Sequence, residues 1–293
     1  MKTLILYNPL SGKGGAETKA KELKALYEQD SEVTVMDVTK QDDLPPILSE
    51  YGAEDRVVLC GGDGTLNRFV YDTEGALPAC DVLYFAEGTG NDFLRDLEKS
   101  VDTPPFSIKE YLTDLPIVEI NGKKSRFLNG IGFGIDGFCC EEGDRLKAKD
   151  PEKPVNYTAV AIKGLLGRFK PRNATVTVDG VEYHYPKVWI AATMHGRFYG
   201  GGMMCAPEQN RLAEDRKNTL VVWYGSGKLK TLTAFPSIFK GEHVKHTDMI
   251  AVHTGHEITV RFDSPCPLQV DGETVLNVTE YQVTAKAPVM AQV

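Results

Sequence analysis

Three short apolar runs, each ending in a glycine-rich segment, constrain the fold of this chain more than any other feature. The runs span residues 3–7, 56–60 and 81–86. Residues 16–28 lie between the first two runs and place apolar side chains near helical spacing. Strands that alternate with helices indicate parallel βαβ units, whose ligands bind at the carboxyl ends of the strands. The sequence therefore predicts an α/β domain with a binding site formed by the three glycine-rich segments.

The pattern changes beyond about Leu115, where two-residue turns separate extended runs. The turns are Asn121-Gly122, Asp179-Gly180 and Asp271-Gly272. Such pairs are typical of tight antiparallel hairpins. One helix is expected to interrupt the strands, from Asn156 to about Gly167. The second part of the chain is therefore predicted to be a mainly antiparallel β domain.

The length and the charge of the chain bound its organisation and its partners. A chain of 293 residues agrees with about two domains. We place the α/β domain at 1–116 and the β domain at 117–279, and expect a tail at about 280–293 to pack back on the first domain. The chain has 33 Lys and Arg against 41 Asp and Glu, a net charge of −8. Neutralising phosphates needs surplus positive charge, so we expect no nucleic-acid partner.

Cysteine usage and hydropathy predict a cytoplasmic location. The six cysteines include no Cys-x-x-Cys pair. We expect no export signal, because the first apolar run is too short for a signal peptide, and the thiols are then expected to be reduced. No apolar run is long enough to cross a bilayer. Contact with a membrane would therefore require a local basic patch.

Two of the glycine-rich segments differ in how strongly they indicate phosphate binding. The segment 8–15 combines glycines, a helix N-terminus and Lys13, which suits a phosphate, but a simple glycine-rich turn explains it equally well. In 61–67, three glycines surround Asp63 directly after a strand. Their amides can wrap a polyphosphate while the carboxylate holds a Mg²⁺-bound water, and a tight turn is the less favoured explanation.

The third glycine-rich segment, 87–93, is a weaker indication when taken alone. Thr89 and Asn91 offer neutral hydrogen bonds to a phosphate or a ribose. Asp92 fits equally well as the N-cap of a helix that begins near Phe93.

Six motifs occur in a fixed order along the chain, from Asn8 to Glu273. They are NPLSGKGGA, GGDGTLN, GTGNDFLRDL, GFGIDG, YGGGMMCAP and VDGE. This series resembles the diacylglycerol kinase catalytic family, which includes soluble bacterial lipid kinases related to sphingosine kinases. GGDGT also occurs in NAD kinases and phosphofructokinases, but its combination with GTGNDF and a late DGE is more specific. The resemblance implies a Rossmann-like α/β domain of the NAD kinase and diacylglycerol kinase type, followed by an antiparallel β-sandwich domain.

The resemblance also implies roles for individual residues. Asp63, Asp92 and Asp136 match acids that form a linked network around the catalytic Mg²⁺. Asp271 and Glu273 belong to the motif that supplies the proton acceptor, and which of the two takes the proton stays open. The residues that match nucleotide-binding positions are Asn8, Pro9, Ser11, Gly12, Lys13, Thr39, Gly61, Gly62, Asp63, Gly64, Thr65, Asn67, Gly88, Thr89 and Asn91.

The chain departs from the family pattern at two places. Glu87 stands where members often have proline, which is expected to be harmless in a loop that faces ATP. Asn218 stands where the family usually has an aspartate that helps to hold a structural metal. A site built from Asp215, Asn218 and Leu220 keeps an oxygen ligand at Asn218 but loses its charge, so we expect a weaker metal site or none.

Taken together, the sequence predicts an enzyme that transfers the γ-phosphoryl group of ATP to a lipid hydroxyl, with Mg²⁺ as cofactor and diacylglycerol or a related lipid as acceptor. The alternatives are an NAD kinase-like phosphotransferase and a catalytically silent lipid- or nucleotide-binding module. The basic stretch from Lys163 to Arg172 predicts either peripheral contact with the inner face of the membrane or a helix that covers the β domain. The oligomeric state is open, with a homodimer as one option.

Overall fold

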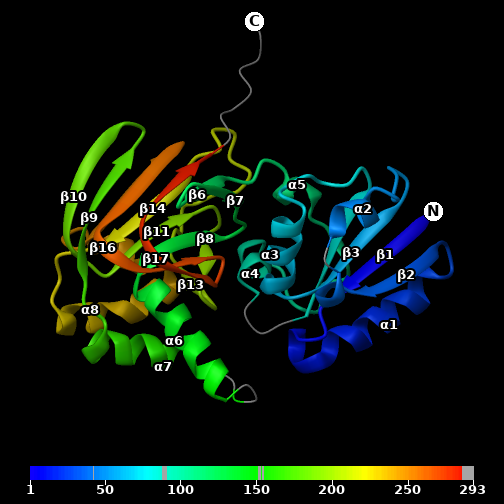
Figure 1. Cartoon of the computed structure of the whole chain (residues 1–293), viewed down its shortest axis with the longest axis horizontal. Coiled ribbons are helices and arrows are strands. Elements are labelled where there is room, and N and C mark those ends of the chain that lie inside the picture. Colours follow the sequence, from blue (N-terminus) through cyan, green and yellow to red (C-terminus); the bar gives the residue numbers. More distant parts are fainter. Residues whose placement is uncertain (42, 88–90, 151–152, 154, 286–293) are drawn as a thin grey trace, which may run out of the picture. The chain divides into compact units, whose positions relative to one another are not determined.

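The computed structural model describes the chain except for residues 42, 88–90, 151–152, 154 and 286–293. It divides into two compact units, Met1–Leu115 and Pro116–Val293 (Figure 1). The boundary lies one residue before the one inferred from the sequence. Among the described residues, no helix has both the length and the hydropathy to span a bilayer.

The first unit is an α/β domain built on a five-stranded sheet. The strand order is β2-β1-β3-β4-β5, in which the first four strands are parallel and β5 is antiparallel to β4. The strands are β1 (Lys2–Tyr7), β2 (Glu32–Asp37), β3 (Arg56–Gly61), β4 (Asp81–Ala86) and β5 (Phe106–Ser107). The helices are α1 (Gly15–Tyr27), α2 (Leu44–Leu48), α3 (Asp63–Asp72), α4 (Asp92–Asp96) and α5 (Lys109–Leu112), with single 3₁₀ turns η1 (Ser11–Gly14) and η2 (Val38–Lys40). The predicted α/β architecture is confirmed.

Helix α1 packs on the sheet through side chains at helical spacing, and the strand ends meet at one edge. In α1, the buried positions Ala16, Ala20 and Leu23 recur at helical spacing and pack on Ile5 and Val58 of the sheet. The three strands β1, β3 and β4 are neighbours, and the pairing of Tyr7 with Cys60 and of Gly61 with Ala86 brings their carboxyl ends to one edge. The three glycine-rich segments therefore leave the sheet side by side.

The second unit contains a ten-stranded antiparallel sheet and a separate two-stranded ribbon. The main path is β15-β14-β11-β8-β16-β17-β6-β7, and β9 joins it through β16 while pairing with β10. The strands of the main sheet are β6 (Ile117–Ile120), β7 (Lys123–Arg126), β8 (Gly130–Gly134), β9 (Arg172–Val178), β10 (Val181–Val188), β11 (Ile190–Met194), β14 (Asn218–Trp223), β15 (Ile250–Gly255), β16 (Glu257–Val270) and β17 (Glu273–Thr284). The ribbon consists of β12 (Phe198–Tyr199) and β13 (Met203–Met204).

All three predicted hairpin turns are present in this unit. They connect β6 to β7, β9 to β10 and β16 to β17. Asn121, Asp179 and Asp271 have φ values of 51°, 47° and 49°, and each is followed by a glycine with positive φ. This is the left-handed backbone that two-residue hairpins require, and it explains the Asn-Gly and Asp-Gly pairs.

Alternate residues of the central strands serve two hydrophobic cores. In β14, Leu220 and Val222 face the core formed with β9, β16 and β17, whereas Val221 and Trp223 face a second core. Helical segments line this second core: α6 (Ile135–Lys149), α7 (Tyr157–Lys163), the π-helical turn η3 (Gly164–Arg168), α8 (Lys228–Ala234), η4 (Phe235–Lys240) and η5 (Glu242–Lys245). Figure 1 shows α6, α7 and α8 together on one side of the sheet.

One expectation for this unit needs correction. The sequence predicted one helix, at 156–167, where the structure has α7 and η3, but α6 and α8 were missed. A Cβ on Gly137 of α6 would lie 2.0 Å from the Pro267 carbonyl oxygen, so this helix packs through close backbone approach. In the region of the expected tail, residues 281–284 belong to β17 and pair with β6. The rest of the expected tail, 286–293, lies outside the described residues.

Candidate functional site

Hydrogen bonds join the loops that follow β1 and β3. The backbone N–H of Asn8 donates to the Cys60 carbonyl oxygen at 3.2 Å. The Ser11 hydroxyl accepts a hydrogen bond from the Gly62 N–H and lies 3.4 Å from the Thr65 hydroxyl. Because these contacts connect residues more than fifty positions apart, they fix the two glycine-rich segments as one surface at the carboxyl edge of the sheet.

The start of α3 presents an open backbone on this surface. The helix begins at Asp63, with Gly62 in extended conformation as its N-cap. Gly64 has no positive φ, and a Cβ built there would have no atom within 4 Å. Neither backbone strain nor packing therefore requires glycine at this position. An accessible amide in the first turn of a ten-residue helix suits an anion.

Asp63 connects the second glycine-rich segment to the third. Its carboxylate accepts hydrogen bonds from the backbone N–H groups of Asp92 at 2.7 Å and Phe93 at 3.2 Å. Asp63 thus caps α4 from a distant part of the chain, and the expectation that Asp92 is the cap is wrong. Asp92 is only 5% exposed, and Arg95 lies 3.8 Å from its carboxylate. The structure therefore brings two of the three predicted network acids together.

Thr39, Gly88, Thr89 and Lys13 are further predicted nucleotide-binding residues in this unit, and they stay predictions. Thr39 lies just beyond the carboxyl end of β2, where both its N–H and its hydroxyl donate to the Asp37 carboxylate at 2.9 and 2.6 Å. The bond from this hydroxyl is the main cause that lowers the pKa of Asp37. Gly88, Thr89 and the side chain of Lys13 lie outside the described residues.

Asp136, the third predicted network acid, lies in the second unit at the start of α6. The residue is 6% exposed, and burial raises the pKa of its carboxyl group from 3.8 to about 7. The buried Tyr199 hydroxyl acts against this shift, but no described group reaches either carboxylate oxygen with a hydrogen bond of normal length. A Cβ on Gly132 would lie 2.8 Å from this carboxylate, which explains one glycine of the GFGIDG region.

Asp271 has a structural task in the turn between β16 and β17. Its carboxylate accepts hydrogen bonds from the backbone N–H groups of Leu128, Asn129 and Gly130, the last two at 2.7 and 2.9 Å. Burial raises the pKa of Asp271 to about 6, against the opposing influence of these three donors and of Arg211. The carboxylate thus holds the chain entering β8.

Arg211 is a part of this network that the sequence analysis missed. It is 4% exposed, and its guanidinium donates to the Leu128 carbonyl oxygen and to the Asn129 side-chain oxygen. Arginine is rarely fully buried without partners, so the burial of Arg211 indicates that these hydrogen bonds are a fixed part of the fold. Nothing in the local sequence around position 211 distinguishes it from a surface arginine.

Glu273 has different surroundings from Asp271, although only Gly272 separates them. It is the first residue of β17 and is exposed. The next residue, Thr274, donates its hydroxyl hydrogen to Asp144 of α6 at 2.6 Å. The two acids of the DGE motif are therefore distinguishable: one secures backbone, and the other presents its side chain to the outside of the described unit.

The residues of the expected structural metal site are engaged elsewhere. The Asp215 carboxylate lies 3.6 Å from the Lys217 ammonium group, and the Asn218 side-chain oxygen lies 3.2 Å from Nδ1 of His195. Leu220 is fully buried in β14. No group of three or more His, Cys, Asp or Glu residues in the described part of the chain is arranged to hold a metal ion.

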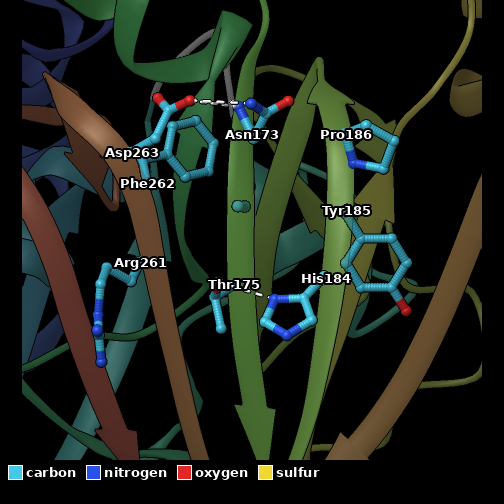
Figure 2. Close-up of a pocket in the computed structure, with 9 residues that line it drawn as sticks. Asn173, Thr175, His184, Tyr185, Pro186, Arg261, Phe262 and Asp263 are labelled. Atoms are coloured by element: carbon cyan, nitrogen blue, oxygen red, sulfur yellow. Dashed lines mark hydrogen bonds between the residues drawn. The ribbon is translucent and has the colours of Figure 1, made fainter.

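A hollow of about 390 Å³ lies on the second unit, away from these motifs (Figure 2). Strands β9, β10 and β16 line it. Its polar side chains are occupied: Thr175 contacts His184 at 3.1 Å, Asn173 donates to Asp263 at 3.1 Å, and Arg261 pairs with Glu280 of β17 at 2.6 Å. The hollow contains none of the predicted site residues and has no free cluster of chemical groups.

Comparison with known proteins agrees with this architecture. The two units of the chain match two family models, one for each unit. Residues 2–115 match the diacylglycerol kinase catalytic domain, and residues 129–289 match the YegS C-terminal NAD kinase beta sandwich-like domain. The chain therefore belongs to the family of proteins that combine a diacylglycerol kinase catalytic domain with a YegS C-terminal NAD kinase beta sandwich-like domain.

Individual relatives are similar over most of their length. A diacylglycerol kinase of Mycobacterium tuberculosis is 26% identical over 275 residues, which make up 90% of this chain and 85% of that protein. The crystal structure of a diacylglycerol kinase from Bacillus anthracis has a TM-score of 0.62 at 18% identity and covers 98% of this chain and 94% of its own. The second likeness shows that the fold is shared.

Proposed function

We propose that this protein transfers the γ-phosphoryl group of ATP to the hydroxyl group of a lipid, with diacylglycerol or a related lipid as the acceptor. The observation that carries the proposal is the joining of the three glycine-rich segments at one sheet edge. Ser11 and Thr65 connect the first two segments, and Asp63 connects the second to the third. This arrangement supports a polyphosphate site because it gathers backbone amides beside carboxylates.

Recognition of the nucleotide is assigned to the first unit. The amides of the loop at 11–15 and of the first turn of α3 would hold phosphate oxygens, and Gly64 leaves the backbone accessible there. Asn67 and Asn91, in the segments beside Asp63, are assigned to the nucleotide by the family resemblance. These groups require no covalent chemistry, since phosphoryl transfer depends mainly on positioning and electrostatic stabilisation.

The same edge fits a magnesium ion that arrives with ATP. Mg²⁺ in kinases is usually held by one or two carboxylates together with waters and substrate phosphates, so a cluster of three protein ligands is unnecessary. Asp63, whose carboxylate lies 2.7 Å from the backbone nitrogen of Asp92, and Asp92 itself are assigned this role. When bound, the ion would neutralise charge that develops on the phosphates. Asp136 is assigned to the acidic network by the family resemblance.

Within the DGE motif, we assign the proton acceptor to Glu273. The Asp271 carboxylate accepts three backbone hydrogen bonds from the chain that enters β8, and we assign it the role of holding that chain. Glu273 is exposed and is the alternative that remains. In the reaction, a lipid hydroxyl oxygen forms a bond to the γ-phosphorus, the bond from that phosphorus to the β–γ bridging oxygen breaks, and ADP leaves with the electron pair. The hydroxyl proton passes to Glu273 as the new bond forms.

A basic surface on the second unit supports contact with an anionic membrane. Residues 157–172 contain four Lys and Arg and no acid, in a chain with a net charge of −8. Leu166 is 61% exposed on η3, and Leu229 is 79% exposed on the neighbouring helix α8, between two lysines. Leu165 and Phe169, in the same stretch, belong to the core of the second unit.

This surface and the thiols suggest where the protein acts. All six cysteines are free, which fits a reducing compartment. We propose a cytoplasmic protein that binds transiently to the inner face of the membrane, where its lipid substrate lies. A basic side chain near an anionic leaflet contributes about 1 kcal/mol to binding, so a few such residues suffice for reversible attachment.

The acceptor can be identified by labelling. The protein is incubated with Mg²⁺, ATP labelled at the γ-phosphate and a total lipid extract, and the labelled lipid is separated and identified. A chloroform-soluble phosphorylated lipid is expected, and its formation should cease in the Glu273→Gln variant. If no lipid becomes labelled with any fraction of the extract while the protein still binds Mg·ATP, the lipid kinase proposal is wrong, and the NAD kinase-like and catalytically silent alternatives are left.

A further inference from the structure

The side chain of Glu87 lies across the loop that follows β1. A Cβ built on Gly12 would lie 2.3 Å from the Glu87 carboxylate, and one built on Gly15 would lie 2.4 Å from the same oxygen. Glycine at both positions leaves room for this carboxylate where it lies. The backbone of Glu87 is fixed as well, because its N–H donates to the Gly61 carbonyl oxygen at 2.8 Å.

Lys19 of α1 holds this carboxylate in place. Its ammonium group lies 2.8 Å from Glu87 and donates to the Ala86 carbonyl oxygen at 3.1 Å. It also lies 4.7 Å from the centre of the Phe85 ring. The side chains of Lys19 and Glu87 are only 26% and 20% exposed, so the pair is shielded more than an ordinary surface salt bridge.

We propose that the Glu87–Lys19 pair sets the affinity of the glycine loop for nucleotide phosphate, with Glu87 as a positioning residue that restrains Lys19. The carboxylate occupies the face of Gly12 and Gly15 and repels an incoming phosphate, while Lys19 offsets that charge. When a phosphate enters, Lys19 exchanges its carboxylate partner for the phosphate. This inference rests on the proposed function, since it assumes that the loop receives the phosphates of ATP.

A series of charge variants tests the proposal through equilibrium binding of Mg²⁺ and a non-hydrolysable ATP analogue with an imido bridge. Glu87→Gln keeps the shape of the side chain and releases Lys19, so binding should tighten about three- to fivefold, the range of one charge pair. Lys19→Gln leaves the carboxylate without its partner and should weaken binding by a similar factor. The double variant should return close to the wild-type affinity, and Lys19→Arg should retain it.

Two controls separate charge from structural damage. Adenosine carries no phosphate, so its binding should be unchanged in every variant. Lys21→Gln makes the same charge change two residues further along α1, on a different face of the helix, and should leave nucleotide affinity unchanged. The proposal is overturned if both single variants weaken binding, or if Glu87→Gln leaves it unaltered while the wild type binds. Failure of the wild-type protein to bind the analogue would contradict the proposed function as well.

Discussion

Replacing the two acids of the DGE motif one at a time should separate stability from catalysis: the Asp271 variant should lose stability, and the Glu273 variant should lose catalytic rate. Asp271→Ala removes the acceptor of three backbone hydrogen bonds, from Leu128, Asn129 and Gly130. A buried donor without an acceptor costs about 1–3 kcal/mol. Partial access of water to this turn reduces the sum, and we expect a loss of about 3 kcal/mol in the free energy of unfolding. The second unit should therefore melt at a lower temperature.

Glu273→Ala should leave stability within about 0.5 kcal/mol of the wild type, because the side chain is exposed. Its kcat should fall about 10²–10⁴-fold if the carboxylate accepts the proton, with little change in the KM for ATP. Glu257→Gln is a matched control, since Glu257 is also an exposed acid at the first position of a strand. It should change neither quantity.

The assay combines chemical denaturation of each variant with initial rates in lipid micelles at saturating ATP. Activity of Asp271→Ala is measured well below its melting temperature, so that unfolding does not imitate a loss of catalysis. The reasoning fails if Asp271→Ala is as stable as the wild type, because the three hydrogen bonds would then have no energetic weight. It also fails if Glu273→Ala retains near-normal kcat, since the proton acceptor would lie elsewhere.

Three further variants test other parts of the account. Asp63→Asn keeps one acceptor oxygen for the N-terminus of α4, where the carboxylate offers two, so we expect the free energy of unfolding to fall by about 1 kcal/mol. In saturating Mg²⁺ the kcat of this variant should fall at least a hundredfold. A near-normal kcat would mean that Asp63 acts only as a helix cap. Asp136 has a folded pKa of about 7 against 3.8 when unfolded, so its protonated form favours the folded state and the stability it supplies is lost as pH rises from about 4 to 7. Asp136→Asn should therefore stabilise the protein by up to about 4 kcal/mol at pH 8 and have no effect near pH 3. Melting curves recorded across this pH range measure the difference. A gain in stability that is the same at every pH would contradict the raised pKa of Asp136. Changing Arg168, Lys170 and Arg172 together to glutamine should weaken sedimentation with anionic vesicles and raise the KM for vesicle-borne lipid. The rate with a short-chain soluble acceptor should be unchanged. Vesicle binding that does not respond to salt would place the contact on another surface.

The elements with strong local signals were predictable from the sequence. Strand β4 was placed correctly at both ends, and the three hairpin turns were located because Asn-Gly and Asp-Gly allow a left-handed backbone that few other pairs adopt. Helix α6 was not predictable, since its close contact at Gly137 replaces the apolar stripe that reveals most helices. Periodicity detects side-chain burial but does not detect close packing of backbones.

The candidate site was also predictable only where the signal is local in the sequence. The glycine-rich segments were expected to meet, because neighbouring parallel strands end at the same edge. The capping of α4 by Asp63 and the burial of Arg211 depend on contacts between residues far apart in the sequence, which no local pattern reveals. The position of the Glu87 side chain against Gly12 and Gly15 is likewise a contact between residues far apart in the sequence.

The choice between a lipid and a soluble acceptor tests the central claim most directly. Equal concentrations of diacylglycerol, in mixed micelles, and NAD are offered together with Mg²⁺ and ATP labelled at the γ-phosphate, and the label is partitioned between the organic and aqueous phases. The account predicts that label enters the organic phase as a phosphorylated lipid, at a rate that Glu273→Gln lowers at least a hundredfold. Label that appears on NAD, with none in the lipid, would contradict it.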